Sequence, residues 1–198
     1  KMLVIGPGAA NIHTLTGNYH GFSPCLVTVL EGITRKMQDK PQISFNYTQG
    51  CMMYSENLNT GWTLGMAESA DVVIAVFGLD NAMEGEEGDA IASPSKGDRD
   101  RIELPSWQLN YLKAMKERGT PIVMVLTGGC PIAFPEDIAD AILMAWYPGE
   151  QGGNAIADII FGDAVPSGKL PVTFPKSTEQ LPPFEDYSMK GRTYRYMK

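Results

Sequence analysis

The residue types that could do chemistry are concentrated in one acidic segment, residues 78–105. This segment follows an apolar run at 71–77 and precedes a helix expected to open at Pro105. Eight acidic and three basic residues give it five of the chain's seven net negative charges. A segment of this length without apolar periodicity is uncommon inside a compact domain, and is usually functional or disordered. Its acidic residues are Asp80, Glu84, Glu86, Glu87, Asp89, Asp98, Asp100 and Glu103.

Four of these acids, Glu84, Glu86, Glu87 and Asp89, are crowded into six positions. Like charges held close together raise the pKa of at least one carboxyl group, which favours a protonated acid near neutral pH. A protonated carboxyl group beside an ionised one is what cleavage of a glycosidic bond requires. Two other interpretations stay open. The segment could be a solvated acidic loop, or a calcium site without the regular ligand order of an EF-hand.

The stretch Gly97-Asp98-Arg99 is expected to support this acidic segment. Asp98 can accept hydrogen bonds from backbone N–H groups near the following helix, and Arg99 can pair with an acid of the segment. The sequence has no serine in a nucleophile elbow and no His-Glu-x-x-His pattern, so a serine hydrolase or a zinc protease finds no support. Its three cysteines lack metal-ligand spacing. We therefore expect neither a metal nor a cofactor.

Apolar runs alternate with segments of helical periodicity along the chain. This alternation predicts an α/β fold in which a mainly parallel sheet of about six strands is sandwiched between helices, with flavodoxin-like layering. Ligands of such sheets bind outside the carboxyl ends of the strands, and the acidic segment leaves one such end. The expected strands lie at 2–5, 43–47, 72–77, 121–126, 141–146 and 170–174, the last of them a strand or an edge segment. The expected helices lie at 26–37, 61–69, from 105 onward and at 154–161.

Domain limits and excluded partners follow from composition. We expect an α/β sandwich domain over residues 1–175 and an extension or linker over 176–198, rich in prolines and aromatic residues, that packs on it. The net charge of −7 argues against a nucleic-acid partner, and no apolar run is long enough to span a membrane. A nucleotide site at Gly6 and Gly8 is a weaker alternative, because Asn11 stands where the third glycine of the dinucleotide fingerprint belongs.

The order of short motifs along the whole chain resembles the C-terminal α/β sandwich domain of glycoside hydrolase family three, the β-glucosidase and β-xylosidase family. Each motif alone is weak, but their joint order is specific. They include GDR at 97–99, LPSWQ at 104–108, AWYPG at 145–149, GGNAIA at 152–157, PSGKLPVTF at 166–174 and GRTYRY at 191–196.

This resemblance implies an exo-acting β-glycosidase that retains configuration, with two carboxyl groups about 5–5.5 Å apart. An upstream TIM barrel, absent from this chain, would supply the aspartate nucleophile, and this domain would supply the acid/base glutamate. Glu86 matches that position best. Glu84 and Glu87 stay open as alternatives, because the Glu-Gly-Glu-Glu run can slip in register.

The resemblance also implies partners and a location. The substrate would be a β-linked gluco- or xylo-oligosaccharide, the protein partner would be the barrel of the same enzyme, and the full-length protein would be periplasmic or secreted. The isolated chain is expected to be inactive, because one of its two carboxyl groups is missing. The alternative is a non-catalytic α/β module that binds carbohydrate or a partner domain.

Overall fold

The computed structural model describes residues 1–56, 59–85, 90–93 and 95–196, and it contains a parallel five-stranded sheet. The strand order is β2-β1-β3-β4-β5, and every neighbouring pair is parallel. The predicted α/β fold with a mainly parallel sheet is therefore confirmed. The strands are β1 (Met2–Ile5), β2 (Phe45–Thr48), β3 (Val72–Gly78), β4 (Ile122–Thr127) and β5 (Ala141–Trp146).

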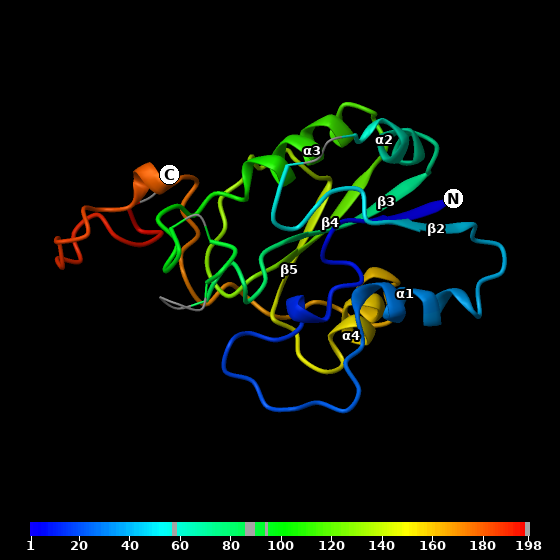
Figure 1. The fold of residues 1–198 in the computed structure, drawn as a ribbon, viewed down its shortest axis with the longest axis horizontal. Coiled ribbons are helices and arrows are strands. Elements are labelled where there is room, and N and C mark those ends of the chain that lie inside the picture. The colour runs from blue at the N-terminus through cyan, green and yellow to red at the C-terminus, as the bar shows by residue number, and fades with distance from the viewer. Residues whose placement is uncertain (57–58, 86–89, 94, 197–198) are drawn as a thin grey trace.

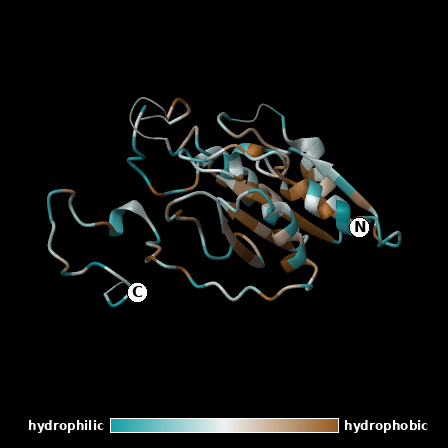
Figure 2. Cartoon of the chain, turned by 90° about the horizontal axis from the view of Figure 1, so that it is seen from below, coloured by the Kyte–Doolittle hydropathy of each residue, from teal (hydrophilic) through white to brown (hydrophobic). Residues whose placement is uncertain are grey.

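Four α-helices cover the two faces of this sheet. Helices α2 (Gly61–Glu68) and α3 (Ser106–Lys116) lie on one face, above the strands in Figure 1, and α1 (Val29–Met37) and α4 (Gly152–Ile160) lie on the other. Each face has its own buried apolar cluster. Successive residues of a strand point to opposite faces, so Leu3 and Ile5 join the first cluster, and Met2 and Val4 the second. The central strands are accordingly apolar along their length (Figure 2).

The expected sixth strand at 170–174 does not form. The sheet of the described residues ends at β5, and residues 170–174 are irregular, with Leu170 and Val172 about half exposed. Pro171 gives the physical reason, because proline has no N–H to donate to a strand ladder. Beyond α4 the chain passes β5, where the Phe174 ring contacts Trp146, and then extends to one side, with the short 3-10 helix η2 (Thr178–Gln180) as its regular element (Figure 1). The domain boundary after residue 175 stays a prediction.

The carboxyl ends of all five strands lie at one edge of the sheet, called here the carboxyl edge, and glycines turn the chain there. Gly6 follows β1 with a φ angle of 125°, and Gly78 is the last residue of β3 with a φ angle of 131°. A Cβ at Gly6 would lie 2.1 Å from the carbonyl oxygen of Val76, and one at Gly78 would lie 2.1 Å from that of Thr127. Close packing between strands therefore accounts for Gly6, and a nucleotide is not needed to explain it.

Candidate active site

The acidic segment begins at the carboxyl end of β3, and a side chain of α3 fixes that point. Gln108 is fully buried. Its amide oxygen accepts a hydrogen bond of 3.0 Å from the N–H of Gly78, and its amide nitrogen donates one of 2.9 Å to the carbonyl of Gly78. Both backbone groups of one residue are thereby satisfied by a single side chain. The first residues of the segment thus leave the sheet in a defined direction.

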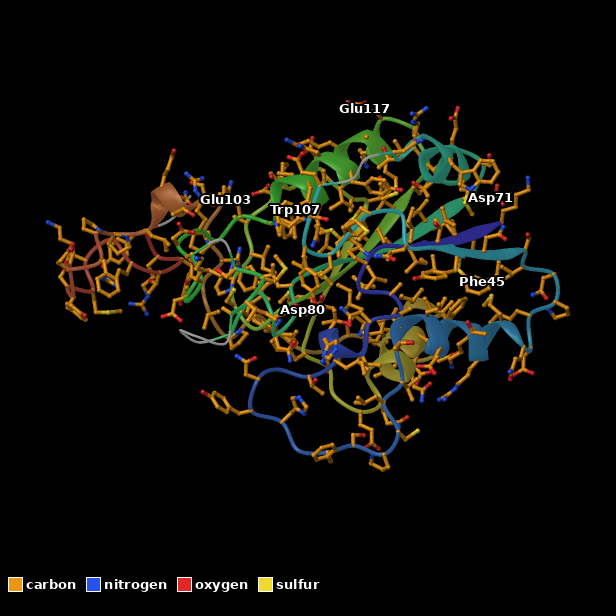
Figure 3. The ribbon with its side chains drawn as sticks, in the orientation of Figure 1. Phe45, Asp71, Asp80, Glu103, Trp107 and Glu117 are labelled. Atoms are coloured by element: carbon orange, nitrogen blue, oxygen red, sulfur yellow. The ribbon has the colours of Figure 1, made fainter. Side chains whose placement is uncertain are left out.

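Asp80 is the first acid of the segment, and it is fully buried. Its carboxylate accepts hydrogen bonds from the Tyr54 hydroxyl, from Nδ2 of Asn11 at 3.2 Å and from the N–H of Ala82 at 3.1 Å. Burial, followed by the neighbouring Asp80 carboxylate, raises the pKa of Tyr54, so the phenol stays protonated and donates. Asp80 therefore joins the loops that follow β1, β2 and β3 (Figure 3).

Glu84 lies four residues further on and contacts the loops that follow β4 and β5. Its Oε2 accepts a hydrogen bond of 2.6 Å from the N–H of Gly129 and another from the Tyr147 hydroxyl, while its Oε1 accepts one of 2.6 Å from the Cys130 thiol. Burial is the main reason that the pKa of Tyr147 is raised and that of Cys130 is raised to about 12, and the Glu84 charge adds to both. Both groups therefore act as donors.

The backbone between these two acids forms a closed turn. The N–H groups of Met83 and Glu84 donate to the carbonyl of Asp80 at 3.0 and 3.1 Å. Ten residues beyond Ala82, the N–H of Ala92 returns to the Ala82 carbonyl at 3.0 Å. Residues 83–91 are thus an excursion whose two ends meet. Glu86 and Glu87, the predicted acid/base and one of its alternatives, belong to this excursion by sequence but lie outside the described residues.

The last part of the acidic segment is held by different contacts. The Arg99 guanidinium donates to the carbonyl of Glu103 at 2.7 Å and to the Cys130 sulfur at 3.2 Å. The Glu103 carboxylate accepts from the N–H of Thr178 at 2.8 Å and from its hydroxyl at 2.7 Å. Figure 3 shows Glu103 on the side of the molecule from which the C-terminal segment extends. This part therefore connects the acidic segment to residues beyond 175.

Asp98 and Arg99, predicted to support the segment, contribute in different ways. The Asp98 side chain is exposed, and its backbone carbonyl accepts a hydrogen bond of 2.7 Å from the Ser95 hydroxyl. Within the described part of the chain, the Arg99 guanidinium contacts a carbonyl and a thiol rather than a loop carboxylate.

Several site residues were not predicted, namely Asp80, Gln108, Cys130 and Tyr147. Gln108 and Tyr147 stand inside the motifs at 104–108 and 145–149, which is the signal that could have identified them. Asp80 and Cys130 give no comparable signal, because their side-chain partners, such as Asn11 for Asp80 and Glu84 for Cys130, are distant in the sequence.

A cleft of about 740 Å³ opens beside the excursion. Its lining is mostly neutral and combines amide, aromatic and imidazole groups with small apolar side chains, a composition suited to an uncharged polar ligand. The lining residues are His13, Asn18, Tyr54, Asn81, Ala82, Ile91 and Ala92. His13 and Asn18 belong to the loop after β1, and Tyr54 belongs to the loop after β2. The cleft therefore lies at the carboxyl edge.

Within the described ranges, no group of three or more His, Cys, Asp or Glu side chains is arranged to hold a metal ion. The helices of these ranges are also too short or too polar for any of them to span a membrane.

The fold and this site define a class of protein, an α/β sandwich domain that carries a fixed acidic segment at the carboxyl edge of its sheet. The chain belongs to glycoside hydrolase family 3, since the model of the glycosyl hydrolase family 3 C-terminal domain matches residues 1–197. The resemblance seen in the motif order is thereby confirmed.

Two relatives of this chain are glycosidases. A xylan 1,4-β-xylosidase of Xylanibacter ruminicola is 48% identical over 143 residues, which cover 71% of this chain and 17% of that protein. A periplasmic β-glucosidase of Salmonella typhimurium is 35% identical over 214 residues, covering 96% of this chain and 27% of that protein. The chain thus spans about a quarter or less of the length of these relatives.

Solved structures agree with this assignment. A GH3 exo-β-xylosidase in complex with a xylobiose aziridine activity-based probe superposes with a TM-score of 0.76 at 30% identity, covering 92% of this chain and 23% of that one. A β-glucosidase from Erythrobacter marinus gives the same TM-score at 33% identity, covering 91% of this chain and 27% of that one.

Proposed function

We propose that this domain contributes the acid/base glutamate to a β-glycosidase that retains configuration, with Glu86 in that role. The observation that carries the proposal is the excursion at 83–91, which starts and ends at the Ala82–Ala92 hydrogen bond on the carboxyl edge of a family 3 domain. Ligands of open parallel sheets bind at this edge. The proposed substrate is a β-linked gluco- or xylo-oligosaccharide, by analogy with the relatives named above.

The proposed reaction has two steps. In the first, an aspartate of a barrel domain attacks the anomeric carbon, and the bond to the leaving oxygen breaks as Glu86 transfers its proton to that oxygen. In the second, the Glu86 carboxylate takes a proton from a water molecule, whose oxygen attacks the anomeric carbon and displaces the aspartate. The sugar is released with its original configuration, and both carboxyl groups return to their starting state.

Exposed apolar side chains support a barrel partner over this edge. Several large hydrophobic residues in the loops after β1, β2 and β3 are exposed, and Phe22 and Ile91 are almost completely so. An apolar surface of this kind marks an interaction site more often than chance. These residues are Ile12, Tyr19, Phe22, Met52, Tyr54 and Ile91. The same observation favours a catalytic domain with a partner over a module that acts alone. A periplasmic or secreted location is proposed from the Salmonella relative.

The test is Glu86→Gln in the full-length enzyme, which keeps the shape of the side chain and removes its proton. Hydrolysis of a substrate with a poor leaving group should fall roughly 10²–10⁴-fold, the usual contribution of general acid–base catalysis. A good leaving group departs without protonation, so added azide should restore turnover of such a substrate. Glu87→Gln is the matched control and should keep near-parental rates. The same loss and rescue in Glu87→Gln instead would assign the role to Glu87.

A further inference from the structure

We infer that Glu84, the first glutamate of the Glu-Gly-Glu-Glu run, is a positioning residue that fixes the base of the excursion and takes no part in proton transfer. This inference rests on the proposed function, because it concerns the segment that carries the proposed acid. It separates the roles of neighbouring glutamates that the sequence leaves equivalent.

The contacts of Glu84 engage both of its carboxylate oxygens. Oε2 accepts hydrogen bonds from the Gly129 N–H and the Tyr147 hydroxyl, and Oε1 accepts one from the Cys130 thiol. All three partners donate, which is the set that an ionised carboxylate accepts. A general acid needs a protonated oxygen within hydrogen-bond reach of the leaving group. Both Glu84 oxygens already accept from donors of this domain, so a proton placed on either oxygen would compete with one of these contacts.

The donors are themselves held in place. The Tyr147 ring fits between two glycines from different loops, since a Cβ at Gly129 would come within 2.9 Å of it and one at Gly17 within 3.3 Å. The residue before it, Trp146, ends β5 with a φ of 55°, a conformation that is rare for a bulky side chain. Such backbone strain persists only where the surroundings hold it, and it is common at functional sites. The Tyr147 hydroxyl is therefore presented to Glu84 by a rigid support.

Cys130 extends the contact to the other end of the acidic segment. Its thiol donates to Glu84, while its sulfur accepts from the Arg99 guanidinium, which also donates to the Glu103 carbonyl. One chain of hydrogen bonds thus runs from Glu84 through Cys130 and Arg99 to the last part of the segment. It joins Glu84 to Glu103, which stand on either side of the excursion's later residues in the sequence. Glu84 is the member of this chain that lies on the excursion's first flank, two residues before Glu86.

The experiment compares Glu84→Gln, Tyr147→Phe and their double variant in the full-length enzyme. Displacement of a reacting group by about 1 Å can cost roughly 100-fold in rate, so kcat on a poor leaving group should fall roughly 10–100-fold in each single variant, with KM nearly unchanged. The double variant should be no slower than the slower single variant, because both changes remove the same contact. Azide should not restore turnover in any of the three.

Two substitutions of Cys130 form a matched pair. Cys130→Ala should lower kcat on the poor leaving group, whereas Cys130→Ser should restore it, because a hydroxyl can donate to Glu84 and accept from Arg99. Glu179→Gln, the same carboxyl-to-amide change at an exposed residue of η2, should leave all rates at parental values. Thermal unfolding midpoints of the variants should stay close to that of the parent.

The results that overturn the inference are distinct from those that overturn the proposed function. Azide rescue in Glu84→Gln would make Glu84 the acid/base. Additive rate losses in the double variant would show that Glu84 and Tyr147 do not act through one contact. Rate losses that parallel decreases in the unfolding midpoint would mean that Glu84 contributes only to the stability of the fold. Failure of azide rescue in Glu86→Gln, measured beside these variants, contradicts the proposed function alone.

Discussion

The two ends of the acidic segment are fixed by different parts of the molecule. The first part, through Asp80 and Glu84, is bound to loops that follow β1, β2, β4 and β5. The last part, through Arg99 and Glu103, is bound to the neighbouring residues of its own segment, to Cys130 and to Thr178 of the C-terminal segment. The first attachment therefore reaches loops of four strands, whereas the last joins the loop after β4, where Ile102 and Leu104 pair with Ala133, and Thr178 of the C-terminal segment.

Burial separates Asp80 from the residues that hold the other end. The Asp80 side chain is fully buried, whereas Glu103 and Thr178 are each partly exposed. A hydrogen bond made in a buried site is costly to lose, because the groups left behind have no water to replace the partner. The comparison predicts a large loss of stability for a change at buried Asp80 and smaller losses for changes at Arg99 and Thr178.

The largest expected effect concerns activity in the absence of any other domain. If the acidic segment were sufficient for catalysis, residues 1–198 alone would hydrolyse aryl β-glucosides and β-xylosides. We expect no turnover, because the retaining reaction needs a second carboxyl group from the barrel. Rates of the purified chain, measured against the full-length enzyme at equal concentration, test this. Comparable turnover would mean that the nucleophile lies within these residues.

Asp80→Ala should be the most destabilising change in the segment. It leaves the Tyr54 hydroxyl, the Asn11 amide and the Ala82 N–H without their shared acceptor. We expect the free energy of unfolding to fall by roughly 3 kcal/mol, measured by urea denaturation. Asp80→Asn keeps one acceptor oxygen and should lose less. Equal stability of Asp80→Ala and the parent would show that this end is not fixed by Asp80.

Arg99→Met should have an intermediate effect. It keeps most of the apolar stem and removes the hydrogen bonds to the Glu103 carbonyl and the Cys130 sulfur. The free energy of unfolding should fall by about 1–2 kcal/mol. Arg99→Lys should recover only part of this loss, because one ammonium cannot reproduce the fork of a guanidinium. Full recovery by lysine would contradict the two-contact geometry.

Thr178→Val should have the smallest effect, and it should depend on pH. Burial alone would raise the pKa of Glu103, but hydrogen bonds from the Thr178 backbone and hydroxyl outweigh it, so the net pKa lies below the ordinary value. A lowered pKa in the folded state stabilises above the unfolded pKa, about 4.3, and this contribution is lost as the pH falls through the folded pKa. The variant lacks the hydroxyl, so its stability should fall less than the parent's during acidification below about pH 5. Parallel pH curves would rule out this contact.

The sequence predicted the layered fold because apolar strand runs and helical periodicity are local signals. The sixth strand was wrong for an equally local reason, since Pro171 interrupts an apolar run that otherwise looks like a strand. Residues 72–78 show the contrast, because their apolar run contains no proline and they form β3, whose residues are mostly buried.

The site was less accessible to prediction. The donors to Asp80 include residues 26 and 69 positions away, and those to Glu84 lie 45 to 63 positions away. Tyr147 stands inside a motif, but no local pattern links either acid to its distant donors, so the sequence did not show which acids of the segment these donors hold. Arg99 was expected to pair with a carboxylate of the segment, and among the described residues its guanidinium contacts a carbonyl and a thiol. The choice of Glu86 came from the family resemblance and stays a prediction.

The most direct test of the central claim, that this domain supplies the acid/base to a nucleophile on another domain, is the product of the Glu86→Gln enzyme with azide. A substrate with a good leaving group should form the glycosyl-enzyme, and azide should then attack it without base assistance. We predict a glycosyl azide of the β configuration, identified by NMR. An α-glycosyl azide would contradict the retaining mechanism, and the absence of any azide product would contradict the role of Glu86.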